Sequence, residues 1–193
     1  MNLPQCQALL AATLADARCS APEESLYGRT GQSVLRMVFA YKSDGETFMA
    51  GGDPVNALAA FLYSFGWLHC GIASGLLVTS GDRTECPFGE GFEPVPAAQY
   101  AKRDEKAGRY SRLLDTAIAS VTPAPDPGTP ACAFAEQVHF IAGVYLLRGD
   151  RQASAGEREY ALACFSYGHG WLDAGVGCGL FSILAHREIF TVD

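Results

Sequence analysis

One predicted helical face near the C-terminus carries three residue types that can do chemistry. Ser166, His169 and Asp173 are spaced at i, i+3 and i+7, which places them on one side of a helix. A serine, a histidine and a carboxylate are the residue types of a hydrolytic triad. Serine nucleophiles, however, usually stand at a strained turn beside an oxyanion hole, and neither is visible in this sequence. His169 and Asp173 can instead form a hydrogen-bonded pair, or supply two metal ligands that need others from elsewhere. We favour the structural pair and predict no catalytic residue.

The remaining polar groups do not match the spacing of a metal or cofactor site. Asp44, Glu46 and Asp53 form an acidic group, but their spacing matches no calcium loop, and helix capping and solvation explain them better. Two other pairs lack further ligands at metal-site spacing: His69-Cys70 and His186-Arg187. The sequence has no glycine-rich phosphate loop followed by Lys-Ser/Thr. We therefore expect neither a metal nor a cofactor.

The charge balance argues against a nucleic-acid-binding protein. The chain has a net charge of −7 and a pI near 5.0, whereas nucleic-acid binders concentrate basic residues on one surface. Only Lys102 to Arg112 is locally basic, and Asp104 and Glu105 dilute it, so we interpret this segment as a solvated helix face. With 49% of its residues apolar, the chain can nevertheless bury a sizeable core.

The cysteines and the N-terminus favour a cytoplasmic setting. The seven cysteines are odd in number, scattered and without a Cys-x-x-Cys pair, and most lie among small or apolar residues. Asp16 and Arg18 interrupt the first apolar run, so no secretory signal is evident. We expect reduced thiols in the cytoplasm.

The most informative stretch of the chain occurs twice. Residues Ala57 to Leu77 align without a gap with residues Ala161 to Phe181 at a constant offset of 104 positions, and eleven of the twenty-one aligned pairs are identical. Both tryptophans, Trp67 and Trp171, lie in this match. Other segments keep the same offset, so we predict an all-α protein of two tandem three-helix up-and-down units with pseudo-two-fold symmetry. The expected repeats are 1–89 and 105–193, with a linker over 90–104.

Helical periodicity and turn residues give approximate bounds for the elements. In the first repeat we expect helices over Gln5 to Cys19, over Gln32 to Lys42 and from Asp53 to about Ser80, with a break at Asp44-Gly45. In the second repeat, Ser154 and Glu157 have the spacing of a capping box that would begin the last helix. No segment shows the strict alternation of a strand.

The repeated helix has a shared seam and a divergent arc. The seam holds a tyrosine, a tryptophan and two glycines at i, i+4 spacing in both copies, and we interpret it as close helix packing rather than a ligand-stacking surface. On the arc, the first copy has Leu62, Phe65, His69 and Ala73, whereas the second has Ser166, His169, Asp173 and Gly177. We expect the first arc to be covered and the second to meet water or a polar cleft.

The length of Ala57 to Val78 meets the criterion for a membrane span, since only His69 is strongly polar in it. The second copy carries His169 and Asp173, and the flanks lack a Lys/Arg cluster, so we interpret both copies as central helices of a bundle.

The last two helices of each copy are similar to a known family. Asp44-Gly45, Gly52-Asp53, Asn56 to Phe61 and Tyr63 to Leu68 resemble an uncharacterised archaeal helical family, domain of unknown function 357. Phe165 to Val176 resembles the other half of that pattern. The resemblance implies a three-helix up-and-down bundle and no activity. Each copy departs from the pattern, the first at His69-Cys70 and the second by lacking both Gly-Asp turns, which leaves open a composite site shared between the halves.

These observations leave the function open between three classes. We place a non-catalytic interaction or scaffold module first, acting as a monomer with an internal pseudo-dimer or as a homodimer, with an unidentified protein partner and no nucleic acid or membrane. The alternative is a small-ligand-binding protein with a cleft between the repeats, and a metal-dependent or hydrolytic enzyme comes third. The candidate ligand-binding residues are Tyr63, Trp67, His69, Tyr167, His169, Trp171 and Asp173.

Overall fold

The computed structural model describes residues 1–80, 87–89 and 91–191, and it confirms the all-α prediction. The first repeat contributes the helices α1 (Leu3–Asp16), α2 (Leu26–Ala50) and α3 (Pro54–Ala73). The second contributes α4 (Tyr100–Ala119), α5 (Pro130–Ser154) and α6 (Arg158–Gly177). Adding 104 to the bounds of α2 and α3 reproduces those of α5 and α6, so the repeat seen in the sequence is a repeat of structure.

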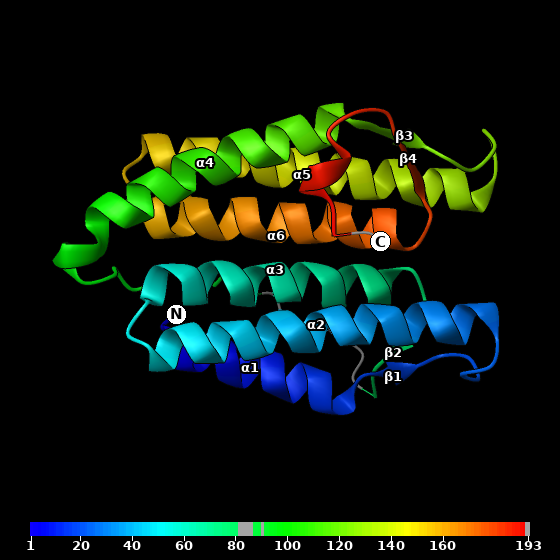
Figure 1. The fold of residues 1–193 in the computed structure, drawn as a ribbon, viewed down its shortest axis with the longest axis horizontal. Coiled ribbons are helices and arrows are strands. Elements are labelled where there is room, and N and C mark those ends of the chain that lie inside the picture. The colour runs from blue at the N-terminus through cyan, green and yellow to red at the C-terminus, as the bar shows by residue number, and fades with distance from the viewer. Residues whose placement is uncertain (81–86, 90, 192–193) are drawn as a thin grey trace.

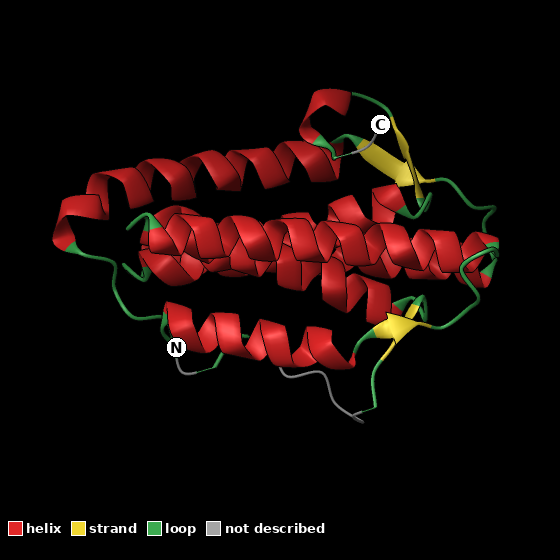
Figure 2. Cartoon of the chain, turned by 60° about the horizontal axis from the view of Figure 1, so that its bottom comes forward, coloured by secondary structure: helices red, strands yellow, loops and turns green. Residues whose placement is uncertain are grey.

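The two repeated helices form the centre of the bundle. In Figure 1, α3 and α6 run side by side, with α1 and α2 on one flank and α4 and α5 on the other. Short antiparallel strand pairs that the sequence did not predict close each repeat: β1 (Arg18–Cys19) with β2 (Leu77–Val78), and β3 (Val121–Pro123) with β4 (Phe181–Ile183). Both pairs lie at the same end of the bundle (Figure 2). Two 3-10 turns, Ala97–Gln99 and Arg187–Ile189, complete the described elements.

Two glycines let α3 and α6 touch backbone to backbone. A Cβ atom on Gly66 would lie 2.5 Å from the carbonyl oxygen of Tyr167, and one on Gly170 would lie 2.4 Å from that of Tyr63. These contacts exchange under the 104-residue offset, as expected of an interface with two-fold character. The helices therefore cross where only glycine fits.

The predicted break at Asp44-Gly45 is wrong, because α2 runs through it to Ala50. A Cβ on Gly45 would lie 2.5 Å from the ring of Phe61, and one on Gly149 would lie 2.3 Å from the ring of Phe165. Each glycine makes room for an aromatic ring of the neighbouring helix. Gly45, which suggested a turn, therefore allows α3 to pack closely against α2.

The other helix ends also differ from the expected ones. α3 ends at Ala73, because Gly75 adopts a left-handed conformation with φ of +74° and the chain turns into β2. The predicted capping box is wrong: Ser154 is the last residue of α5, and Glu157 precedes α6 without a side-chain cap. The first helix is capped instead, by a capping box between Asn2 and Gln5.

α4 begins at Tyr100, so helix takes up the end of the segment 90–104 that we expected to connect the repeats. The interpretation of Lys102 to Arg112 as a solvated helix face does not hold for Lys106, which is buried, although Lys102, Asp104, Glu105, Arg109 and Arg112 are exposed. The extra length of α4 brings Lys106 next to the N-terminus of α3.

The polar arc of α6 does not face water, contrary to one of our two expectations. Ser166, His169 and Asp173 are all buried, and the hydroxyl of Ser166 donates to the Leu162 carbonyl oxygen within its own helix at 2.9 Å. By length and composition alone, α3 and α5 could each cross a membrane. Most of α3 is buried inside the bundle, whereas most of the apolar window of α5 is not.

Candidate functional site

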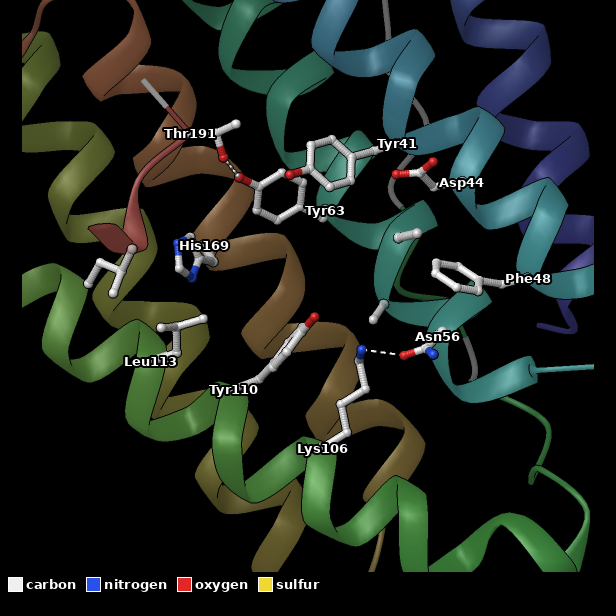
Figure 3. Close-up of a pocket in the computed structure, with 13 residues that line it drawn as sticks. Tyr41, Asp44, Phe48, Asn56, Tyr63, Lys106, Tyr110, Leu113, His169 and Thr191 are labelled. Carbon is white, nitrogen blue, oxygen red and sulfur yellow. Dashed lines mark hydrogen bonds between the residues drawn. The ribbon is translucent and has the colours of Figure 1, made fainter. Parts of the chain in front are cut away.

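A cleft of about 340 Å³ opens between the two repeats. Its walls come from α2 and α3 of the first repeat, from α4 and α6 of the second, and from Ile189 and Thr191 (Figure 3). α4 presents Lys106, Tyr110 and Leu113 to it, at the i, i+4, i+7 spacing of one helical face. We call this hollow the open cleft.

A chain of polar contacts fixes the lysine end of the open cleft. Lys102 forms an ion pair with Asp53 at 2.6 Å, and Asp53 accepts a hydrogen bond from the side-chain amide of Asn56 at 2.5 Å. The carbonyl oxygen of that amide accepts a hydrogen bond from the Lys106 ammonium, drawn as a dashed line in Figure 3. Asn56 is thereby held with its oxygen towards Lys106.

Lys106 is a buried cation with a neutral partner. Its side chain lies 4.7 Å from the centre of the Tyr110 ring, and none of the described carboxylates lies within ion-pair distance of it. Burial, and then the nearby Arg109 charge, lower the pKa of Lys106 to about 8. The ammonium has three donors, and Asn56 takes one of them.

The other end of the open cleft is built on a buried carboxylate. Asp173 accepts a hydrogen bond from the Tyr63 hydroxyl and another from the Thr191 backbone amide at 2.9 Å. The Tyr63 hydroxyl also lies 3.1 Å from the Thr191 hydroxyl. Burial, and then the Asp173 charge, raise the pKa of Tyr63 well above its usual value, so the phenol stays neutral. This network fixes the ring of Tyr63 as a wall.

His169 lies between the two ends and stays neutral at pH 7. Burial lowers its pKa, against the opposing effects of Asp173 and of a hydrogen bond to the Ile189 backbone. Its ring centre lies 5.8 Å from that of Tyr63. The cleft thus offers aromatic walls, a buried cation and neutral polar groups.

The pseudo-symmetric counterpart of the open cleft is occupied by the chain itself. Phe88, in the described stretch 87–89, lies between Tyr145, Tyr160 and Tyr167 of α5 and α6, with ring centres 5.1, 5.5 and 5.2 Å away. The Arg148 guanidinium lies 5.2 Å from the centre of the same ring. Phe88 is only 8% exposed. We call this region the filled cleft.

The offset of 104 relates the residues of the two clefts one to one. The four residues around Phe88 correspond to four that line the open cleft: Tyr41, Asp44, Asn56 and Tyr63. The supporting contacts correspond as well, because Tyr63 bonds to Asp173 and Tyr167 bonds to His69, at 2.8 Å between the hydroxyl oxygen and Nδ1. Each hydrogen bond joins the two repeats.

The seven candidate ligand-binding residues are thus distributed over three places. Tyr63 and His169 line the open cleft, and Asp173 holds Tyr63 from behind. Tyr167 and His69 belong to the filled cleft. Trp67 and Trp171 are buried, and neither is among the described residues that line the open cleft.

Sequence reasoning missed Lys106, Asn56, Tyr41 and Tyr110. A signal existed, because Asn56 aligns with Tyr160 and Asp44 with Arg148 inside otherwise similar helices. Lys106 gave no such signal, since it lies outside the aligned core in a segment that looks like a charged surface helix.

A wider hollow of about 700 Å³ lies at the end of the bundle where α2 and α5 begin, and it has no charged side chain among its described lining residues. The described part of the chain brings together no group of three or more His, Cys, Asp or Glu side chains that could hold a metal ion.

Comparison with known proteins gives a family without a known function. No curated protein and no solved structure matches the chain. The family described as protein of unknown function (DUF357) matches residues 7–77 and 109–181, one segment in each repeat. Since these segments make up more than half of the chain, the protein belongs to this family and carries two tandem copies of its domain.

Proposed function

We propose that the protein binds a small molecule in the open cleft between its repeats. The observation that carries the proposal is the contrast between two equivalent hollows: one is packed with the chain's own Phe88, and the other is an accessible cleft with the buried cation Lys106 in its wall. A buried ammonium whose hydrogen-bonding partner is a neutral amide is costly for stability, so its retention favours a role in binding.

Native mass spectrometry of the gently purified full chain tests this proposal. We expect a reproducible added mass that denaturation releases. Asn56→Tyr, which copies Tyr160 of the other repeat into the open cleft, should abolish the added mass. The matched control, Ala40→Tyr, adds the same ring to the exposed face of α2 and should retain it. A bare chain that also gains no mass from an extract of small metabolites would overturn the proposal.

A second candidate function, self-association as an interaction module, rests on the outward face of α5. Phe140, Val144 and Leu147 are exposed there at i, i+4, i+7, whereas the matching positions of α2 hold Arg36, Ala40 and Ser43. Glu136 and Arg151, both exposed, flank the apolar stripe on the same face.

This stripe is self-complementary. In an antiparallel pair of α5 helices, Phe140 would face Leu147 of the other copy, Val144 would face Gly143, and Glu136 would face Arg151, since each pair of numbers has the same sum. A Cβ on Gly143 would meet nothing within 4 Å, so this face is open to close approach.

Light scattering after size-exclusion chromatography tests the self-association. We expect a dimer that Glu136→Arg or Arg151→Glu weakens and that the double variant restores, whereas Arg36→Glu on α2 changes nothing. A monomer at about 100 μM would overturn the dimer, because specific homodimers usually have far tighter dissociation constants. If that monomer bound lipid vesicles through α5, the face would be assigned to a membrane surface instead.

A further inference from the structure

The filled cleft indicates what shape the open cleft can accommodate. Its occupant is a flat six-membered ring, held by three tyrosine rings and one guanidinium group. All four of these groups come from α5 and α6 positions whose counterparts in α2 and α3 line the open cleft. The occupant is Phe88 of the same chain, so the filled cleft is packed without a separate ligand.

The open cleft keeps the aromatic platform on which that ring rests. The ring centres of Tyr41 and Tyr63 are 4.3 Å apart with their planes at 51°, and those of Tyr145 and Tyr167 are 4.5 Å apart at 54°. Tyr63 and Tyr167 are each fixed by a hydrogen bond to the opposite repeat. The two platforms thus have nearly the same geometry, and both suit a planar ring.

The open cleft differs from the filled one in its charged groups. Asn56 stands where the second repeat has Tyr160, so a smaller amide replaces a phenol ring, and at the position of Lys106 the first repeat has the uncharged Asn2. Lys106 is 8% exposed, and its hydrogen-bonding partner is neutral. An anionic group would supply the missing countercharge and accept the remaining donors.

We propose that the open cleft binds an aromatic acid: a planar ring beside Tyr41 and Tyr63, with its anionic group at the ammonium of Lys106. This inference rests on the proposed function and names its ligand class. The ring takes the place that Phe88 takes in the filled cleft, and Asn56 positions Lys106 for the anion. The volume of about 340 Å³ suits a single-ring compound with a short acidic arm.

Backbone amide NMR of the ¹⁵N-labelled full chain tests the ligand class with three probes of similar size. Phenylacetate has the ring and the charge, phenylacetamide has the ring alone, and cyclohexylacetate has the charge with a non-planar ring. We expect phenylacetate to shift the amides of Tyr41, Tyr63 and His169 and to bind at least about tenfold more tightly than either other probe.

A matched pair of variants separates the lysine from the general charge of α4. Lys106→Met should abolish the preference for phenylacetate over phenylacetamide, while Arg112→Met, which removes an exposed charge from the same helix, should keep it. The Lys106→Met spectrum also shows directly whether that variant is folded. If it is not, Lys106→Arg, which retains the cation, must retain the preference.

The outcomes distinguish this inference from the proposed function. Equal binding of the three probes in the cleft would overturn the aromatic acid and leave the binding function in place. Shifts confined to residues outside the open cleft, or no shift with any probe at about 20 mM, would also overturn it, since fragments of this size bind their sites in the millimolar range. The added mass in native spectra then decides the binding function independently.

Discussion

The open cleft and the filled cleft are formed by equivalent helical positions of the two repeats, yet their contents differ. Both are built from the same helical positions, both have a tyrosine pair at the base, and both depend on a hydrogen bond to the other repeat. They differ in their occupant. Phe88 fills one, whereas Lys106, Asn56 and Asp173 make the other polar.

The difference teaches which features belong to the fold and which to the site. Where the same residue type stands in both copies, as with Tyr63 and Tyr167 or Gly66 and Gly170, it supports the packing of α3 against α6. Where the copies differ, as with His69 and Asp173, the contacts differ: His69 lies against the ring of Phe65, whereas Asp173 accepts a hydrogen bond from the Thr191 amide. Agreement between the repeats therefore indicates what the two clefts share, and divergence indicates what distinguishes the open cleft from the filled one.

Removing the ring of Phe88 from the filled cleft should have the largest effect on stability. Phe88→Ala should lower the free energy of unfolding by about 3 kcal/mol, because it leaves a cavity among Tyr145, Tyr160 and Tyr167. Phe48→Ala, at a 38% exposed phenylalanine of the open cleft, should cost less than about 1 kcal/mol. Chemical denaturation measures both. Equal losses would show that the two clefts do not differ in packing.

The crossing of α3 and α6 is the element that both clefts share, and it should tolerate little change. Gly66→Ala places a methyl group against the carbonyl of Tyr167, and we expect a net loss of about 2 kcal/mol after the gain in helix propensity. Gly108→Ala on α4 is the control: its new methyl group meets only the end of Arg112 at 3.6 Å, so it should stabilise by about 0.5 kcal/mol. Thermal melts of both variants check the signs. If Gly66→Ala did not change the stability, α3 and α6 could move apart at that point without a cost in free energy.

The helical architecture could be predicted because its signals are local and duplicated. The periodicity of α3 and α6 and their constant offset identify the central helices and the two-fold plan. The bounds of the helices were less predictable. Gly45 has the sequence pattern of a helix breaker, but it lies inside α2 and leaves room for the ring of Phe61. The sequence alone does not show that a glycine makes room for a ring 16 positions later.

The open cleft could be predicted only in part. Tyr63, His169 and Asp173 come from helices whose pairing follows from the repeat. Lys106 and Asn56 meet only because α4 is longer than α1 at its N-terminus and reaches across to the other repeat. Nothing local to either residue indicates that contact. The filling of the other cleft by Phe88 is likewise a tertiary contact that nothing local to Phe88 indicates.

Acid should distinguish the two hydrogen bonds that join the repeats. Burial lowers the pKa of His69 to about 4, whereas an unfolded histidine titrates near 6.5. Since protonation favours the unfolded chain between these values, stability is fully present above pH 6.5 and is lost as the pH falls towards 4. At pH 5.5 His69 alone should reduce the free energy of unfolding by about 1.4 kcal/mol.

His69→Phe isolates this contribution. The variant removes the hydrogen bond between His69 and Tyr167 at every pH, so its stability is lower throughout. Its loss of stability between pH 7 and pH 5.5 should nevertheless be smaller by about 1.2 kcal/mol. His169, whose pKa is also lowered by burial, accounts for a remaining slope in both proteins. Denaturation curves at the two pH values measure the difference, and parallel slopes would contradict the neutral state of His69.

The smallest expected effect is on the charge at the mouth of the open cleft. Asp44 is exposed there, and Arg148 stands at the matching position of the filled cleft, over the ring of Phe88. Asp44→Arg should therefore strengthen binding of phenylacetate about threefold at low ionic strength, since exposed charge pairs contribute less than about 1 kcal/mol. The gain should disappear at about 0.5 M salt, where the screening length falls to about 4 Å. Phenylacetamide, titrated in parallel by NMR, should show no salt-dependent gain, and an equal gain for this neutral probe would mean that the arginine acts by stacking on the ring rather than by charge.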